Sequence, residues 1–155
     1  GLNKELLAQE GLPPGAIKGI VSVSGVYDLA GFAEPGLVPT RKEQAFGTDP
    51  AELRQASPLT YVRADAPPML ITFTGWDLFM IREEALRMYQ LMLRRNAPVE
   101  LVKVPGRTHY DQMDGIGKRN SQVDDVLGLA VTRFVLDLVK GPDLLQAVKR
   151  ADPQP

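Results

Sequence analysis

This chain of 155 residues contains no cysteine and only one histidine. Without thiols it can form neither a disulfide framework nor a thiolate zinc site. One imidazole also excludes a histidine-rich metal site formed by this chain alone, and we expect no metal and no other cofactor. The length is that of one domain, and a hydrophobic content of 44% is enough for a buried core. Residues 1–155 are therefore predicted to form a single domain.

The sequence also lacks an excess of charge of either sign and a long apolar segment. The formal net charge is −1, with basic and acidic residues interspersed, so nothing favours binding to nucleic acid or to an anionic membrane. No apolar run approaches the roughly 20 residues that span a bilayer. The N-terminus has no signal-peptide pattern. We expect a cytoplasmic protein with neither nucleic-acid nor membrane partners.

Three short apolar runs have the composition of buried β-strands. They are IKGIVSVSG, PMLITFTG and VELVKV, which place strands near 17–24, 68–75 and 99–104. The middle run is apolar at nearly every position, as expected when both faces of a parallel sheet are covered. Because helical segments separate these runs, the order predicts βαβ units, and so an α/β fold with a mainly parallel sheet.

Helical patterns lie around these strands. NKELLAQE at 3–10 precedes the first strand, and the sequence DPAE at 49–52 has an Asp N-cap followed by proline. Residues 82–95, REEALRMYQLMLRR, combine an apolar stripe with an acidic start and a basic end. A last long helix begins near Ser121, and residues 142–155 are expected to add a short helix and a frayed tail.

Two polar residues follow the second and third predicted strands. Asp77 comes directly after Gly75-Trp76, and His109, the sole imidazole, ends the sequence PGRTH. Because adjacent parallel strands end at the same edge of a sheet, Asp77 and His109 can meet there. A carboxylate bonded to one imidazole nitrogen fixes the tautomer and stabilises the imidazolium. The pair is therefore a candidate acid–base unit.

Structural interpretations of these residues stay open. A lone histidine in a loop is commonly a surface or structural residue, and Asp77 is also placed to cap a turn or the following helix. Asp111 and Asp114, close to His109 in sequence, are expected to solvate their loop. Asp28, in GVYD, either orients a loop near the site or caps its own turn.

Three segments taken in order resemble the C-terminal half of an α/β-hydrolase. IKGIVSVSGVYDL, QASPLTYVRADAPPMLITFTGWDLFM and VELVKVPGRTHY are similar to the carboxylesterase and arylformamidase-like branch, over roughly residues 3–140. The resemblance implies a partial three-layer fold and a serine hydrolase of carboxylic esters or amides. In that family the triad acid follows the penultimate strand in a G-x-D turn, matched by Asp77. The base lies in a G-x-x-H loop after the last strand, matched by His109.

The family's nucleophile lies in a G-x-S-x-G elbow, and this sequence contains no such motif. Neither Ser22 nor Ser24 has the small residues that the elbow needs two positions before and two positions after the serine, since Ile20 precedes Ser22 and Val26 follows Ser24 at that distance. We interpret both as small polar residues at a buried strand end. The family's oxyanion loop, which lies upstream, is absent as well. The resemblance therefore implies the acid and base of a triad without its nucleophile, and we expect the isolated chain to be nearly inert as an esterase.

Aromatic residues beside the two triad positions are candidates for substrate contact. If a nucleophile-bearing half completes the site, the pocket for a small ester or amide would draw on Trp76, Phe79 and Tyr110, with Met80. Each of these residues is equally interpretable as part of the core or of a surface patch.

In the family that the sequence resembles, the strand matched by residues 17–24 lies between two neighbours. We expect it to lack one of them here, because no strand-like run precedes it in the given sequence. Its edge carries Ile20, Val21 and Val23, with Lys18 as the single charged residue. An apolar edge is a template for association. We expect it to be covered by a second copy, by a separate N-terminal fragment, or by residues 1–16 folding back.

An alternative function follows from the same edge. The chain would then be a non-catalytic α/β domain that keeps the fold without the chemistry and acts through self-association, for example as a homodimer, or through partner binding. The two hypotheses differ at the candidate site, because a domain freed from catalysis has no reason to hold Asp77 against His109.

Overall fold

Residues 1–31, 45–78, 80–114, 116–117 and 125–140 are described by the structure, which is a computed structural model. The elements in chain order are α1 (Lys4–Gln9), β1 (Ile20–Val23), α3 (Pro50–Ala56), the 3-10 helix η1 (Pro58–Tyr61), β2 (Met69–Trp76), α4 (Ile81–Arg94), β3 (Val99–Thr108) and α5 (Val126–Lys140). Ser121 and the predicted helix and tail at 142–155 lie outside the described residues.

The three strands form one parallel sheet in the order β1-β2-β3, as the sequence predicted. Met69 is the common point of register, opposite Ile20 on one side and Val99 on the other. The third strand is longer than the predicted 99–104, because it continues to Thr108. The register shifts between Thr74 and Trp76 of β2. A bulge of this kind lets β3 continue through Pro105-Gly106, which has the composition of a turn.

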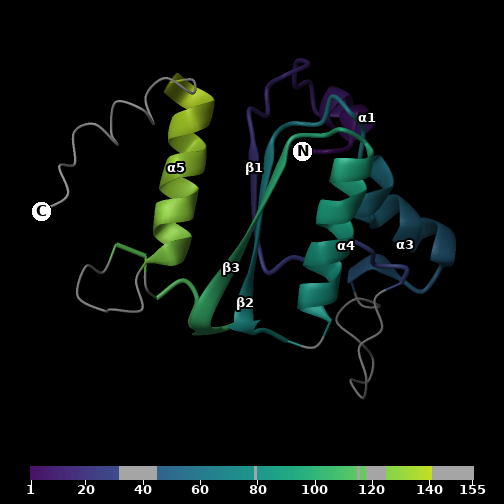
Figure 1. Cartoon of the computed structure of the whole chain (residues 1–155). Coiled ribbons are helices and arrows are strands. Elements are labelled where there is room, and N and C mark those ends of the chain that lie inside the picture. The colour runs from purple at the N-terminus through teal and green to yellow at the C-terminus, as the bar shows by residue number, and fades with distance from the viewer. Residues whose placement is uncertain (32–44, 79, 115, 118–124, 141–155) are drawn as a thin grey trace, which may run out of the picture.

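Helices cover both faces of the sheet, with α5 on one side and α4 and α3 on the other (Figure 1). Side chains of β2 alternate between the faces, as expected of a strand. Met69, Ile71 and Phe73 pack in one buried cluster with Ala85, Met88 and Met92 of α4, whereas Leu70 packs with Ala130 and Phe134 of α5. These two clusters make a three-layer α/β arrangement.

Two helix starts test the expected capping residues. Asp49 caps α3, since its Oδ1 accepts a hydrogen bond of 2.7 Å from the amide of Ala51. Helix α4 begins differently, because its N-cap position is Met80, with a left-handed φ of 64° and no side-chain cap. The alternative in which Asp77 caps this helix is therefore wrong, and its carboxylate is free for other contacts.

Strand β1 pairs only with β2 among the described residues. The amides of Ile20 and Ser24 donate to carbonyls of the β2 side at 2.9 Å each, so by alternation those of Val21 and Val23 point to the open edge. The N-terminal segment folds back in part, because Leu2 is buried in the cluster that contains Met69. No described residue pairs with the edge backbone. No helix in the described part of the chain has the length and apolarity to cross a bilayer.

Candidate active site

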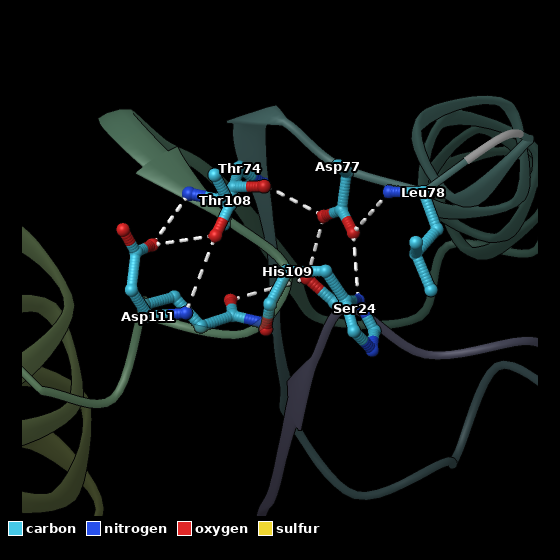
Figure 2. A network of polar contacts seen from close by, with 8 residues as sticks. Ser24, Thr74, Asp77, Leu78, Thr108, His109 and Asp111 are labelled. Atoms are coloured by element: carbon cyan, nitrogen blue, oxygen red, sulfur yellow. Dashed lines mark hydrogen bonds and ion pairs between the residues drawn. The ribbon is translucent and has the colours of Figure 1, made fainter.

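Asp77 and His109 lie side by side at the carboxyl edge of the sheet, as predicted (Figure 2). Oδ1 of Asp77 is 2.8 Å from Nδ1 of His109. The Asp77 side chain is 3% exposed and that of His109 is 29% exposed. The contact favours the tautomer with the hydrogen on Nδ1, because that nitrogen faces the carboxylate of Asp77. Nε2 is then the nitrogen that can take a proton from another group.

The Asp77 carboxylate accepts a full set of hydrogen bonds. Its Oδ2 accepts from Oγ of Ser24 at 2.6 Å and from the amide of Thr74 at 2.9 Å. Its Oδ1 accepts from the amide of Leu78 at 3.0 Å, in addition to His109. Burial raises the pKa of Asp77, but these hydrogen bonds, led by that of Ser24, outweigh burial and leave the pKa below its ordinary value. The carboxylate is therefore charged at neutral pH.

The turn that carries His109 is fixed from both sides. Oδ1 of Asp111 accepts from the amide and the hydroxyl of Thr108, at 2.6 and 2.9 Å, and these two hydrogen bonds lower the pKa of Asp111. Nε2 of Gln112 donates to the carbonyl of His109 at 2.9 Å. Asp111 thus shapes the turn, beyond the solvating role expected of it, while Asp114 is exposed.

Ser24 is the contact that sequence reasoning missed. Its predicted place at a buried strand end is confirmed, since it is 7% exposed, but its hydrogen bond to Asp77 was not foreseen. The available signal was position, because Ser24 follows β1 directly, at the same sheet edge as the other two turns. Gln112, whose Oε1 lies 3.1 Å from Oγ of Ser24, had no comparable signal.

Asp28 caps its own turn, which is one of the two alternatives for this residue. Its carboxylate accepts from the amide of Gly31 at 3.0 Å and from Arg87 at 2.7 Å. The same turn is held by Glu84 of α4, which is 3% exposed and accepts from the amides of Tyr27 and Asp28 at 2.8 Å each. This buried carboxylate fixes the segment that follows Ser24.

The side chains proposed for substrate contact differ in their surroundings. Trp76 is 74% exposed and Tyr110 is 80% exposed, so the interpretation of either as a core residue is wrong. The Tyr110 ring packs edge-on to that of His109, with centroids 5.4 Å apart. Phe79 lies outside the described residues. Contact of these residues with a substrate stays a prediction.

One cavity borders Asp77. It has a volume of about 460 Å³ and is lined by Thr74, Gly75, Asp77, Leu78, Met80, Arg82 and Glu83. A larger cavity of about 520 Å³ includes Ser22 and Tyr27 in its lining but neither Asp77 nor His109. Within the described ranges, no cluster of three or more His, Asp or Glu residues is placed to bind a metal ion.

Neither a protein-family model nor a curated protein matches this sequence. Solved structures do match. Esterase 2 of Thermogutta terrifontis aligns with 80% of this chain and 43% of its own, at 21% identity and a TM-score of 0.54. A truncated carbohydrate esterase from gut microbiota aligns with 60% of this chain and 35% of its own, at 22% identity and a TM-score of 0.51. The acylaminoacyl peptidase of Pyrococcus horikoshii aligns with 64% of this chain and 17% of its own, at 20% identity and a TM-score of 0.54.

The chain spans less than half the length of each of these proteins. At this level of identity the likeness is one of fold. Three parallel strands between helices, matched to parts of these proteins, identify a partial α/β-hydrolase fold.

Proposed function

We propose that this chain carries the acid and the base of a serine-hydrolase triad that acts on carboxylic esters or amides. The 2.8 Å contact between Oδ1 of Asp77 and Nδ1 of His109 carries the proposal. The esterase and peptidase neighbours in the partial α/β-hydrolase fold support it.

The geometry supports the following chemistry. Nε2 of His109 takes the proton of a serine hydroxyl as its oxygen attacks the substrate carbonyl carbon, and the resulting imidazolium is stabilised by Asp77. His109 then gives this proton to the leaving alcohol or amine. A water molecule attacks the acyl-enzyme in the same way, and the acid product leaves.

The nucleophile of this proposal lies outside the sequence. The described serine closest to the pair is Ser24, and its hydroxyl hydrogen points to Asp77 rather than to His109. A serine that donates to a carboxylate, with no contact to the base, is not activated for attack. We therefore expect the isolated chain to release no burst of p-nitrophenol from a short-chain p-nitrophenyl ester.

The open edge of β1 is the proposed place for the missing part. The backbone groups of Val21 and Val23 face that edge, next to Ser24 and the candidate site. A strand paired there in parallel would end at the same sheet edge as β2 and β3, and a serine directly after it would lie on the side of the sheet where His109 lies. The completing segment is either an N-terminal extension of this chain or a separate fragment.

Self-association is the second candidate role. It is favoured by the same edge, where Val21 is 38% exposed, because a second copy can add its own strand. Both roles would use the same edge of β1, but they differ at the site, where the hydrogen-bonded Asp77–His109 pair favours the hydrolase.

The test is to extend the chain by the coding region immediately upstream of Gly1 and to assay this extended chain. We expect it to contain a G-x-S-x-G elbow, to hydrolyse short-chain p-nitrophenyl esters, and to be labelled on the elbow serine by a fluorophosphonate. His109→Gln should abolish both hydrolysis and labelling. An extended chain with an elbow serine but no hydrolysis, or full activity of the His109→Gln variant, would contradict the proposal.

A further inference from the structure

We propose that Ser24 is a positioning residue for the Asp77–His109 pair. Its hydroxyl holds one carboxylate oxygen of Asp77 so that the other faces the imidazole. The catalytic consequence of this inference rests on the proposed function, whereas its structural part concerns the isolated chain.

The two oxygens of Asp77 have separate partners. Oδ2 receives the Ser24 hydroxyl at 2.6 Å, and Oδ1 receives Nδ1 of His109 at 2.8 Å. A carboxylate is free to rotate about its Cβ–Cγ bond unless both oxygens are held. The amides of Thr74 and Leu78 also donate to Oδ2 and Oδ1, at 2.9 and 3.0 Å. Among the described residues the Ser24 hydroxyl is the only side-chain group other than His109 that donates to Asp77, and its contact is the shortest of the four.

The backbone of Ser24 indicates that its side chain is placed with some strain. Its φ is 47°, in the left-handed region that favours glycine. The amide is fixed to β2 by a 2.9 Å bond to the carbonyl of Thr72. Glycine adopts this conformation more easily than serine does. A substitution of Ser24 by glycine therefore removes the hydroxyl without straining the backbone.

Gln112 connects Ser24 to the turn that carries His109. The Ser24 oxygen lies 2.6 Å from Asp77 and 3.1 Å from Oε1 of Gln112. One hydroxyl hydrogen serves both acceptors, and the shorter contact to the charged carboxylate receives the larger share. Because Nε2 of Gln112 donates to the carbonyl of His109, Ser24 touches both the acid and the support of the base.

Ser22 supplies a matched control on the same strand. It lies two residues before Ser24, and its hydroxyl is 2.6 Å from the phenol oxygen of Tyr27. No side-chain hydrogen bond joins Ser22 to Asp77 or His109 in the described part of the chain. Removing this hydroxyl changes β1 by the same chemical group but leaves the candidate site alone.

The first experiment uses nuclear magnetic resonance on the isolated chain, in which the sole imidazole and the Asp77 carboxyl can be followed. Ser24→Gly removes the hydroxyl and keeps a backbone that tolerates the left-handed φ, so this variant is expected to fold. We expect a smaller fraction of the Nδ1–H tautomer of His109 and an upward shift of the pKa of Asp77, with Ser22→Ala like wild type. A folded Ser24→Gly variant with an unchanged tautomer and unchanged Asp77 titration overturns the inference.

The second experiment measures kinetics in the extended chain. Loss of one hydrogen bond to a charged group should lower kcat by roughly ten- to a hundredfold in Ser24→Gly, with KM largely kept and Ser22→Ala unaffected. If wild type hydrolyses esters and Ser24→Gly does so equally well, the positioning role fails while the proposed function stands. If wild type is inactive, the proposed function fails, and the resonance experiment alone decides the role of Ser24.

Discussion

Asp77 and His109 are hydrogen-bonded across 32 positions of sequence because Trp76 and Thr108, the residues just before them, are register partners. Earlier along the strands Thr74 pairs with Val104, so β3 uses four residues where β2 uses two. With a continuous register, Arg107 rather than His109 would stand opposite Asp77. The irregularity near Gly106 therefore aligns the imidazole with the carboxylate.

Gly106 is expected to be sensitive to substitution, because its φ of 62° lies in the left-handed region. Gly106→Ala should lower the free energy of unfolding by about 1 kcal/mol, measured by urea denaturation. Gly75→Ala is the control, since an added Cβ there meets nothing closer than 3.6 Å. Equal stability of the two variants would show that the bulge does not need glycine.

Acid should weaken the fold through Asp77. The folded-state pKa of Asp77 is below its ordinary value, so its stabilising contribution is complete above the unfolded pKa of about 3.9 and is lost as the pH falls through the lower, folded-state pKa. In Asp77→Asn this part of the acid dependence should disappear, and stability at pH 7 should fall by about 2 kcal/mol.

Asp114→Asn serves as the control for the acid experiment, because Asp114 is exposed. Its free energy of unfolding should stay within about 0.5 kcal/mol of wild type. Urea unfolding between pH 7 and pH 3 measures both variants. The same acid dependence in wild type and Asp77→Asn would be evidence against a lowered pKa of Asp77.

High pH should destabilise the folded state through ionisation of Tyr27. Desolvation by burial raises the pKa of Tyr27 to about 12, and the nearby Glu84 also raises it. The folded state thus keeps a proton that the unfolded chain loses near pH 10, so this contribution is complete below about pH 10 and is lost as the pH rises to about 12. Ultraviolet titration should show one phenol ionising near pH 12, and Tyr27→Phe should remove it. A Tyr27→Phe spectrum that retains this late step would assign the step to another tyrosine.

Glu84 should matter far more than its neighbour Glu83. Glu84→Ala leaves the amides of Tyr27 and Asp28 without their acceptor, which should cost about 3 kcal/mol of unfolding free energy. Glu83 is exposed, and Glu83→Ala should change stability by no more than about 0.5 kcal/mol. Chemical denaturation compares the two, and a similar loss in both would mean that the buried acceptor is not what holds the turn.

The open edge of β1 predicts concentration-dependent association if no other segment covers it. Val21→Lys places a charge beside that edge and should shift the chain toward the monomer. Light scattering over a range of concentrations measures the effect. A wild-type chain that stays monomeric throughout would exclude self-association and leave the completing segment as the proposed occupant.

The sequence was sufficient to predict the sheet and the Asp77–His109 contact, for physical reasons. Apolar runs such as 68–75 identify strands, and parallel connections place the following turns at one edge. The length of β3 was missed, because Pro105-Gly106 has the composition of a turn and only the neighbouring strand holds it in the sheet. No local pattern encodes that tertiary pairing.

The residues around the Asp77–His109 pair were harder to predict from the sequence than the pair itself. Ser24 was correctly placed in a buried strand end, but its φ of 47° and its bond to Asp77 depend on how β1 ends beside β2. Gln112 reaches the site from a turn that follows β3 with no periodic pattern. Contacts that single polar side chains make between turns could therefore be identified only in the three-dimensional structure.

Whether Asp77 acts as the acid of a catalytic triad is decided by kcat for a p-nitrophenyl ester in the extended chain carrying Asp77→Asn, compared with Asp114→Asn. A carboxylate that fixes the histidine tautomer and stabilises the imidazolium is worth roughly 10³ to 10⁴ in kcat. We predict a loss of that size in Asp77→Asn and wild-type rates in Asp114→Asn. A kcat of Asp77→Asn within a fewfold of wild type would show that Asp77 is not the acid of a triad.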